Sequence, residues 1–133
     1  MSDDDFEIVR RVWAAAGRAD PEAMRGDLHP EIVAVPFGAD LEGKAYRGPD
    51  EVVGWFRDEI LSTWEFFRVI PQEFQRVGER LLVTGRWQAR GIESGVDLDI
   101  AASWVLELRD GQIVYWHTYT DHDQARRDAG LDA

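Results

Sequence analysis

The residues best suited to chemistry lie near the C-terminal end of the sequence, in the stretch WHTYTDHD at positions 116–123. This stretch holds two histidines, two aspartates and three hydroxyl-bearing side chains. Histidine titrates near neutral pH, and together with carboxylates it can transfer protons or coordinate a metal ion. Whether these groups can act together depends on which of them share a face of the element that carries them.

The first half of the stretch is interpreted as the end of a β-strand. Successive side chains of a strand point to opposite faces of the sheet. Trp116, Thr118 and Thr120 are therefore expected to point inward, and His117 and Tyr119 to point to the other side. This arrangement keeps the His117 imidazole away from the interior.

The second half is interpreted as the start of a helix. Asp121 is a typical N-cap residue, and Gln124 three positions later completes a capping box, which we favour over a catalytic Asp121. The spacing of His117 and His122 fits neither a strand pair nor one face of a helix, so no metal site is predicted. His29, in the segment LHPEI, is assigned to a turn. No cofactor is expected.

Composition narrows the class of protein. A chain of 133 residues is expected to form one domain, 1–133, with a single core. Fifteen Lys and Arg against 26 Asp and Glu give a formal charge of −11, which would repel nucleic acids and acidic membranes. The absence of cysteine and of a signal-like N-terminus fits a reducing compartment. We expect a cytoplasmic protein with no nucleic-acid or membrane partner.

Helices are predicted mainly in the first half of the chain. The spacing of apolar residues predicts a helix from Asp5 to Gly17, with a buried face made of Phe6, Val9, Val12, Trp13 and Ala16. Asp20-Pro21 starts a short second helix that ends near Gly26. A brief strand over 32–35 stops at a proline, and 37–48 is expected to be a loop. Pro49 opens a third helix, whose buried face carries Val52, Val53, Phe56 and Ile60.

From Glu65 onward the apolar pattern changes to a period of two, which predicts strands. Turns at 77–79 and 91–95 separate a first strand, a second over 80–90 and a third that contains Trp104. The hairpin at Arg109-Asp110-Gly111 leads into a fourth strand. The expected fold is α+β, with helices on one face of an antiparallel meander.

The hairpin leaves two registers open. A two-residue Asp-Gly loop would place Val105 opposite Trp116. A three-residue loop keeps the apolar faces of the two strands continuous, and we favour it for that reason. It pairs Leu106 with Val114, Trp104 with Trp116, and Ala102 with Thr118.

Four segments, in this order and spacing, carry a family resemblance: EIVRRVWAAAGRADPEAM, LHPEIVAVP, YRGPDEVVGWF and LRDGQIVYWHTYTDHDQA. The chain resembles the SnoaL-like branch of the nuclear transport factor 2-like (NTF2-like), ketosteroid isomerase-like superfamily. The resemblance implies a cone-shaped, curved, mainly antiparallel sheet wrapped around N-terminal helices. It also implies a pocket between helices and concave sheet, and a homodimer through the convex face. Functions in this superfamily range from isomerase, polyketide cyclase and hydrolase to plain binding.

The catalytic positions that the resemblance implies are mostly occupied by residues that cannot transfer protons. The Arg-x-Asp pair and further Asp of the epoxide hydrolases match Arg86, Gln88 and Thr118 here. The base and the proton donor of the ketosteroid isomerases match Pro36 and Trp104. Only the arginine is kept, so the catalytic residues are unknown.

The strand pattern also yields a set of expected pocket residues. On the concave face we expect Thr84 and Val114 beside the candidate ligand-binding residues, with Trp55 or Trp64 closing the wide end. Some of the six tryptophans are expected to line a pocket. The candidate ligand-binding residues are Arg86, Gln88, Trp104, Trp116, Thr118, Trp13 and Phe56.

Arg86 has two interpretations. It could form a structural ion pair, for example with Asp40 or Glu42, because an isolated buried charge costs several kcal/mol. Alternatively, it could recognise a carbonyl, enolate or carboxylate of a ligand, with Gln88 and Thr118 adding neutral hydrogen bonds.

Three functions remain open from the sequence. The first is a module that binds a small apolar ring-bearing or carbonyl ligand, in a cavity of roughly 300 Å³ or more. The second is an isomerase, polyketide cyclase or hydrolase that uses Arg86 to stabilise negative charge. The third is a dimeric interaction domain whose convex surface carries Trp87, Val105, Tyr115 and Tyr119.

Overall fold

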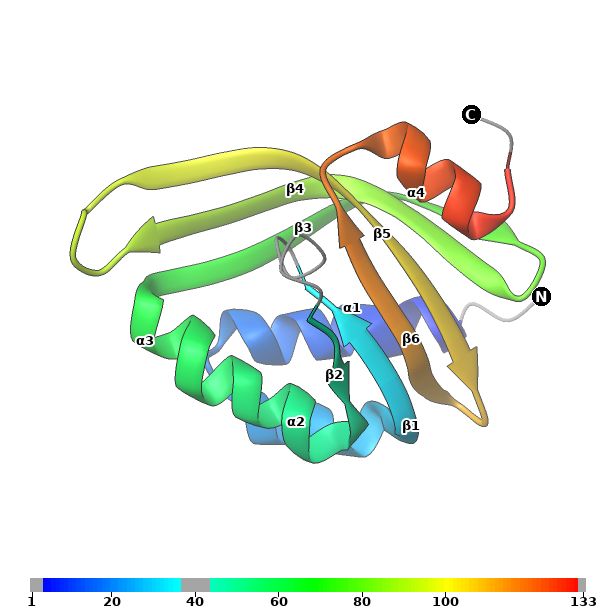
Figure 1. The fold of residues 1–133 in the computed structure, drawn as a ribbon, viewed down its shortest axis with the longest axis horizontal. Helices are drawn as coiled ribbons and strands as arrows, with labels where there is room; N and C mark the ends of the chain where they lie inside the picture. Colours follow the sequence, from blue (N-terminus) through cyan, green and yellow to red (C-terminus); the bar gives the residue numbers. More distant parts are fainter. Residues whose placement is uncertain (1–3, 37–43, 132–133) are drawn as a thin grey trace.

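A curved six-stranded sheet organises the chain, with helices on both of its sides (Figure 1). The structure is a computed structural model, and it describes residues 4–36 and 44–131. The strand order is β2-β1-β6-β5-β4-β3. The strands are β1 (Leu28–Val35), β2 (Tyr46–Arg47), β3 (Trp64–Val77), β4 (Arg80–Gly91), β5 (Asp97–Arg109) and β6 (Gln112–Tyr119).

Helices cover the sheet unequally. Helix α1 (Asp4–Gly17) and the 3-10 helix η1 (Pro21–Asp27) are followed later by a continuous helical run. This run consists of α2 (Gly48–Trp55), the π-helical turn η3 (Phe56–Ile60) and α3 (Leu61–Thr63). These helices lie against one face of the sheet, called the inner face here, whereas α4 (His122–Ala129) lies against the outer face (Figure 1).

The predicted α+β plan is confirmed, but the expectation that the helices lie on one face is wrong for α4, which packs on the outer face. Strands β3 to β6 form the expected antiparallel meander. The structure adds two features that the pattern did not indicate: β1 pairs with β6 in parallel, and the two-residue strand β2 pairs with β1. The predicted third helix is present but contains the π-turn η3, a feature that often occurs near functional sites.

The hairpin between β5 and β6 corrects the predicted register. Asp110 and Gly111 both have positive φ (55° and 75°), and Arg109 pairs directly with Gln112, so the turn contains two residues. The ladder then shifts, because Leu108 pairs with Ile113 while residue 107 pairs with residue 115. The bulge takes up Val114. The observed pairs are Leu106 with Trp116 and Trp104 with Thr118, and the predicted three-residue loop is wrong.

The bulge keeps the side chains on the expected faces despite the different turn. It adds one residue to β6, so Trp116 and Thr118 still share a face with Trp104. At the start of β6, however, Ile113 belongs to the main core cluster, which does not include Val114. The expectation that Val114 lies on the inner face is therefore wrong, and Ile113 takes that place.

The core lies between the inner face and the helices. Helix α1 turns Val9, Val12, Trp13 and Ala16 into it, as the helical period predicts. A second, smaller cluster lies on the outer face, where Ala125 and Ala129 of α4 pack on Leu82 and Val105. No helix among the described residues is long and apolar enough to cross a membrane.

Candidate functional site

The stretch WHTYTDHD does not form a catalytic cluster in the structure. Asp121 is the N-cap of α4, and its Oδ1 accepts hydrogen bonds from the backbone N–H groups of Asp123 (2.9 Å) and Gln124 (3.2 Å). The predicted capping role of Asp121 is confirmed. Its carboxylate satisfies the first N–H groups of the helix, so it is not directed at the interior.

His117 and Tyr119 lie on the outer face, as the alternation predicts. Their rings stack at 4.0 Å between centroids with an interplanar angle of 5°. Tyr115 and Tyr119 both donate their hydroxyl protons to Oδ2 of Asp128, at 2.5 Å and 2.7 Å. Arg80 donates to the other carboxylate oxygen of Asp128 at 2.6 Å. This network ties the last turn of α4 to β4 and β6.

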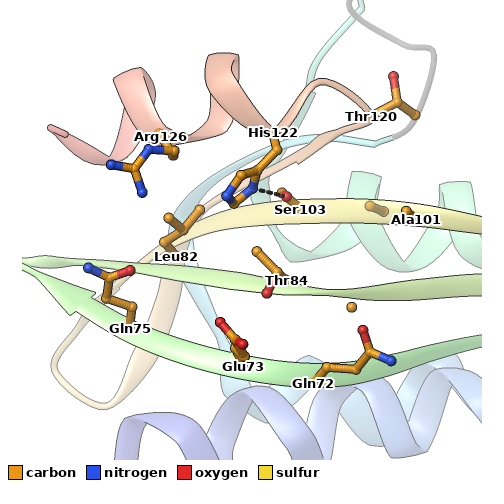
Figure 2. Close-up of a pocket in the computed structure, with 12 residues that line it drawn as sticks. Gln72, Glu73, Gln75, Leu82, Thr84, Ala101, Ser103, Thr120, His122 and Arg126 are labelled. Atoms are coloured by element: carbon orange, nitrogen blue, oxygen red, sulfur yellow. Dashed lines mark hydrogen bonds between the residues drawn. The ribbon is translucent and has the colours of Figure 1, made fainter. Parts of the chain in front are cut away.

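His122 is hydrogen-bonded to Ser103 of β5 across the outer face, with 2.8 Å between Nδ1 and Oγ (Figure 2). The pair borders an open outer groove of about 350 Å³, which β3 flanks with polar side chains such as Glu73. Because Ser103 is only 4% exposed, its hydroxyl is poorly placed to attack a substrate. We interpret the pair as a structural hydrogen bond that holds α4 against the sheet. The sequence analysis missed it, because it depends on where α4 docks.

Among residues 4–36 and 44–131, no group of three or more His, Asp or Glu side chains could hold a metal ion. His29 lies in β1, not in a turn, and its Nδ1 accepts a hydrogen bond from the backbone N–H of Glu31 at 3.0 Å.

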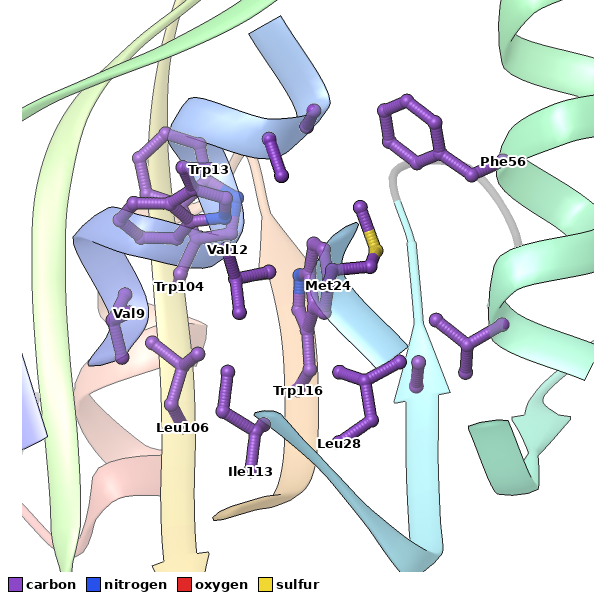
Figure 3. Close-up of a cluster of buried hydrophobic side chains, with 14 of the residues drawn as sticks. Val9, Val12, Trp13, Met24, Leu28, Phe56, Trp104, Leu106, Ile113 and Trp116 are labelled. Atoms are coloured by element: carbon purple, nitrogen blue, oxygen red, sulfur yellow. The ribbon is translucent and has the colours of Figure 1, made fainter. Parts of the chain in front are cut away.

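The candidate site is a cavity between the inner face and the helical run 48–63. Its volume is about 160 Å³. Figure 3 shows the buried hydrophobic side chains that surround Trp104 and Trp116 beside helix α1. The cavity is lined by Pro36, Trp55, Ile60, Trp64, Phe67, Val69, Trp87, Leu98, Trp104, Trp116 and Thr118.

The aromatic walls are held by contacts between rings. Trp87 lies edge-on to Trp64 (5.5 Å, 89°) and to Phe67 (5.5 Å, 70°). Trp104 is fixed from behind by Trp13 of α1 at 5.1 Å. The edge-to-face contacts of Trp87 and the tilted contact of Trp13 with Trp104 add to the stabilisation from burial and hold each ring in one orientation. The cavity is therefore formed before any ligand enters it.

Most of the tryptophans that were expected to line the pocket do line the cavity. Trp104, Trp116 and Thr118 line the cavity, and so do Trp55 and Trp64 from its wide end. Two further candidates, both from the helices, form the layer behind the wall. Trp13 packs on Trp104, and Phe56, which is fully buried, lies 5.5 Å from Phe67. Neither Trp13 nor Phe56 lines the cavity.

The placement of Arg86 and Gln88 in the pocket is wrong. Residue 83 lies opposite Trp104, so odd-numbered residues of β4 share the inner face and even-numbered ones point outward. Arg86 binds Asp99 on the outer face, with 2.5 Å from Nε to Oδ1 and 3.0 Å from Nη2 to the carbonyl oxygen. This hydrogen bond lowers the pKa of Asp99.

The structural ion pair considered for Arg86 is thus present, with a different partner from the one expected. Asp40 and Glu42 lie outside the described residues. Thr84 also faces outward, into the outer groove.

Trp87 is the pocket tryptophan that the sequence analysis missed. It is 5% exposed and lines the cavity, although it was expected on the convex surface. The signal was available in β4 itself, where the small or apolar residues Val83, Gly85, Trp87 and Ala89 alternate with Thr84, Arg86, Gln88 and Arg90. The expected pocket set instead assigned the even-numbered residues of this strand to the concave face.

The cavity offers little chemistry. None of the described residues that line the cavity has a side chain that gains or loses a proton near neutral pH. The polar side-chain groups of its wall are indole N–H groups and the Thr118 hydroxyl. Trp116 donates its indole N–H to Oγ1 of Thr118 at 3.2 Å. The site can enclose an apolar molecule and offer it hydrogen-bond donors, but these residues supply no general base.

Comparison with known proteins agrees with this architecture. Residues 9–116 match the model of the SnoaL-like domain. The chain belongs to the SnoaL-like family. No curated protein matches the sequence significantly.

Solved structures similar to this SnoaL-like chain share its fold at low sequence identity. An NTF2-like protein of unknown function from Burkholderia pseudomallei is 24% identical, with a TM-score of 0.76 over 98% of this chain and 100% of that chain. A protein with a ketosteroid isomerase-like fold from Catenulispora acidiphila, in complex with trimethylamine, is 18% identical, with a TM-score of 0.76 over 94% and 93%. An LEH-like epoxide hydrolase from M. tuberculosis is 18% identical, with a TM-score of 0.73 over 89% and 83%.

The network around Asp128 predicts a loss of stability at alkaline pH. Burial, together with the Asp128 carboxylate, raises the pKa of Tyr115. An unfolded chain ionises tyrosine near pH 10, whereas the folded protein keeps Tyr115 protonated. The free energy of unfolding should therefore fall as the pH rises above about 10. Urea unfolding between pH 7 and 11 measures this slope.

Tyr115→Phe should reduce the alkaline slope, while costing about 1 kcal/mol at pH 7 through the lost hydrogen bond. Tyr46→Phe is the control, since the Tyr46 hydroxyl lies 3.4 Å and 3.5 Å from the Glu59 carboxylate oxygens, outside the outer-face network. Equal slopes in the wild type and Tyr115→Phe would show that Tyr115 is not responsible.

Proposed function

We propose that the inner cavity binds a compact, neutral ligand that carries a ring or a carbonyl group, and that it catalyses no reaction. The observation that carries this proposal is the wall itself, which combines five indole rings and one phenyl ring with a single hydroxyl group. Burying a charged ligand there would cost several kcal/mol without a counter-charge among the described lining residues. A neutral ring transfers only apolar surface from water into the cavity, and this transfer is favourable.

The volume limits the size of the ligand. The cavity of about 160 Å³ is smaller than the roughly 300 Å³ expected from the sequence. A dry apolar cavity of about 150 Å³ can still hold benzene. Burying a ring of about 200 Å² at about 25 cal/mol per Å² contributes about 5 kcal/mol, which corresponds to a dissociation constant near 1 mM or below.

The enzyme alternative is an isomerase, polyketide cyclase or hydrolase that uses Arg86 for charge stabilisation. Among these reactions, epoxide hydrolysis is the one to test, because the similar structure from M. tuberculosis is an LEH-like epoxide hydrolase. This alternative is weaker, because Arg86 pairs with Asp99 on the outer face and cannot reach a ligand in the cavity.

A homodimer through the outer face stays a prediction. Of the residues expected on that surface, Trp87 faces inward and Val105 is covered by α4, which leaves a more polar surface than expected. Sedimentation equilibrium tests it: we expect a mass of twice 15.2 kDa, and a mass of 15.2 kDa would contradict the dimer.

Titration with a panel of small molecules tests the binding function. Toluene, cyclohexanone and cyclohexene oxide should bind with dissociation constants near 1 mM or below, as measured by chemical shifts of the indole N–H groups. Benzoate should not bind, because its charge would be buried unpaired.

Two variants and one product assay sharpen this test. Leu98→Phe adds volume at the wall and should weaken toluene binding, whereas Arg86→Met, on the outer face, should leave it unchanged. Cyclohexene oxide should be recovered unchanged after incubation. Its conversion to a diol would contradict the proposal and favour the hydrolase, and binding of benzoate in preference to toluene would contradict the neutral ligand.

A further inference from the structure

We infer that the inner cavity selects a ligand with a hydrogen-bond acceptor, such as a ketone, lactone or quinone oxygen, and that Thr118 makes this selection. The inference rests on the proposed binding function and narrows the class of ligand. It depends on the direction of the hydrogen bonds at the wall.

The hydrogen bond between Trp116 and Thr118 fixes that direction. The two residues are neighbours on the inner face of β6, and the indole N–H of Trp116 donates to Thr118 Oγ1 at 3.2 Å. An indole N–H can only donate, so the Thr118 oxygen must be the acceptor. Thr118 is 7% exposed and lines the cavity.

This contact uses one lone pair of the hydroxyl oxygen and leaves its proton to be donated. No described side chain that lines the cavity other than Thr118 carries a hydrogen-bond-accepting oxygen, since the remaining polar side-chain groups are indole N–H donors. A ligand oxygen at this point would complete a chain from Trp116 through Thr118 to the ligand. Hydrogen bonds in such a chain strengthen one another.

The same geometry disfavours other ligands of similar size. A molecule with only a donor could use only the second lone pair of the Thr118 oxygen, because the other polar side-chain groups of the described wall are indole N–H donors. The Thr118 proton would then have no acceptor on that ligand. A carboxylate is a good acceptor, but none of the described lining residues is a cation, so its charge would be buried alone. A neutral carbonyl oxygen meets both conditions.

A pair of matched probes tests the inference. Cyclohexanone and methylenecyclohexane have nearly the same shape, and only the first has an acceptor oxygen. The wild-type protein should bind cyclohexanone about threefold to tenfold more tightly. Thr118→Val, which keeps the shape but lacks the hydroxyl, should abolish this preference without weakening methylenecyclohexane. Thr118→Ser should retain it, and Arg86→Met on the outer face should not change it.

The infrared carbonyl stretch of bound cyclohexanone provides a second readout. It should lie at lower frequency in the wild type than in Thr118→Val, which a merely structural role of Thr118 would not produce. If the wild type binds both probes equally, or if Thr118→Val keeps the preference, the selection by Thr118 is wrong and the binding function stands. If neither probe binds the wild type, the binding function itself is wrong, and the inference falls with it.

Discussion

The register that joins β4, β5 and β6 is the constraint on which the rest of the structure depends. Side chains alternate across a strand, so the pairing of Val83 with Trp104 and of Trp104 with Thr118 determines every residue of these strands that faces the helices. A slip of one residue would turn Trp87 to solvent and bring Arg86 inside. The bulge at Val114 belongs to the same constraint, because it reconciles a two-residue turn with the side-chain faces of β6.

The walls of the cavity follow from that register. The inner face receives Trp87, Trp104 and Trp116, and the helical run across from it adds Trp55. Large rigid rings cannot fill a curved surface completely, and their edge-to-face contacts keep them from collapsing into the space that remains. Arg86 and Arg80 instead lie on the outer face, where each has a carboxylate partner. The inner cavity thus has an apolar, aromatic wall, whereas Arg86 and Arg80 are paired on the outer face, and this arrangement supports the proposed binding function.

Local signals were sufficient for most of the fold. Helical periodicity identified α1, alternation identified the meander, and the N-cap role of Asp121 could be read from its type and position. The parallel pairing of β1 with β6 and the docking of α4 depend on contacts between distant segments, which no local pattern specifies. The bulge was missed for a related reason, since it is visible only once both partner strands are aligned.

The pocket could be predicted in part. Trp104, Trp116 and Thr118 were placed correctly because the alternation of β5 and β6 is clear. Arg86 and Gln88 were misplaced because the even-numbered residues of β4 were assigned to the concave face, although the alternation within β4 pointed to Trp87. Similarity of fold fixes where a pocket lies, but the residues of each chain decide what it can hold.

The most direct test of the apolar, aromatic cavity is a crystal structure determined under xenon pressure. Xenon occupies apolar cavities that water leaves empty. We predict a xenon atom among Trp87, Trp104 and Trp116, with Arg86 paired to Asp99 on the opposite face of the sheet. A cavity that excludes xenon and instead contains ordered water or an ionisable side chain would contradict the account.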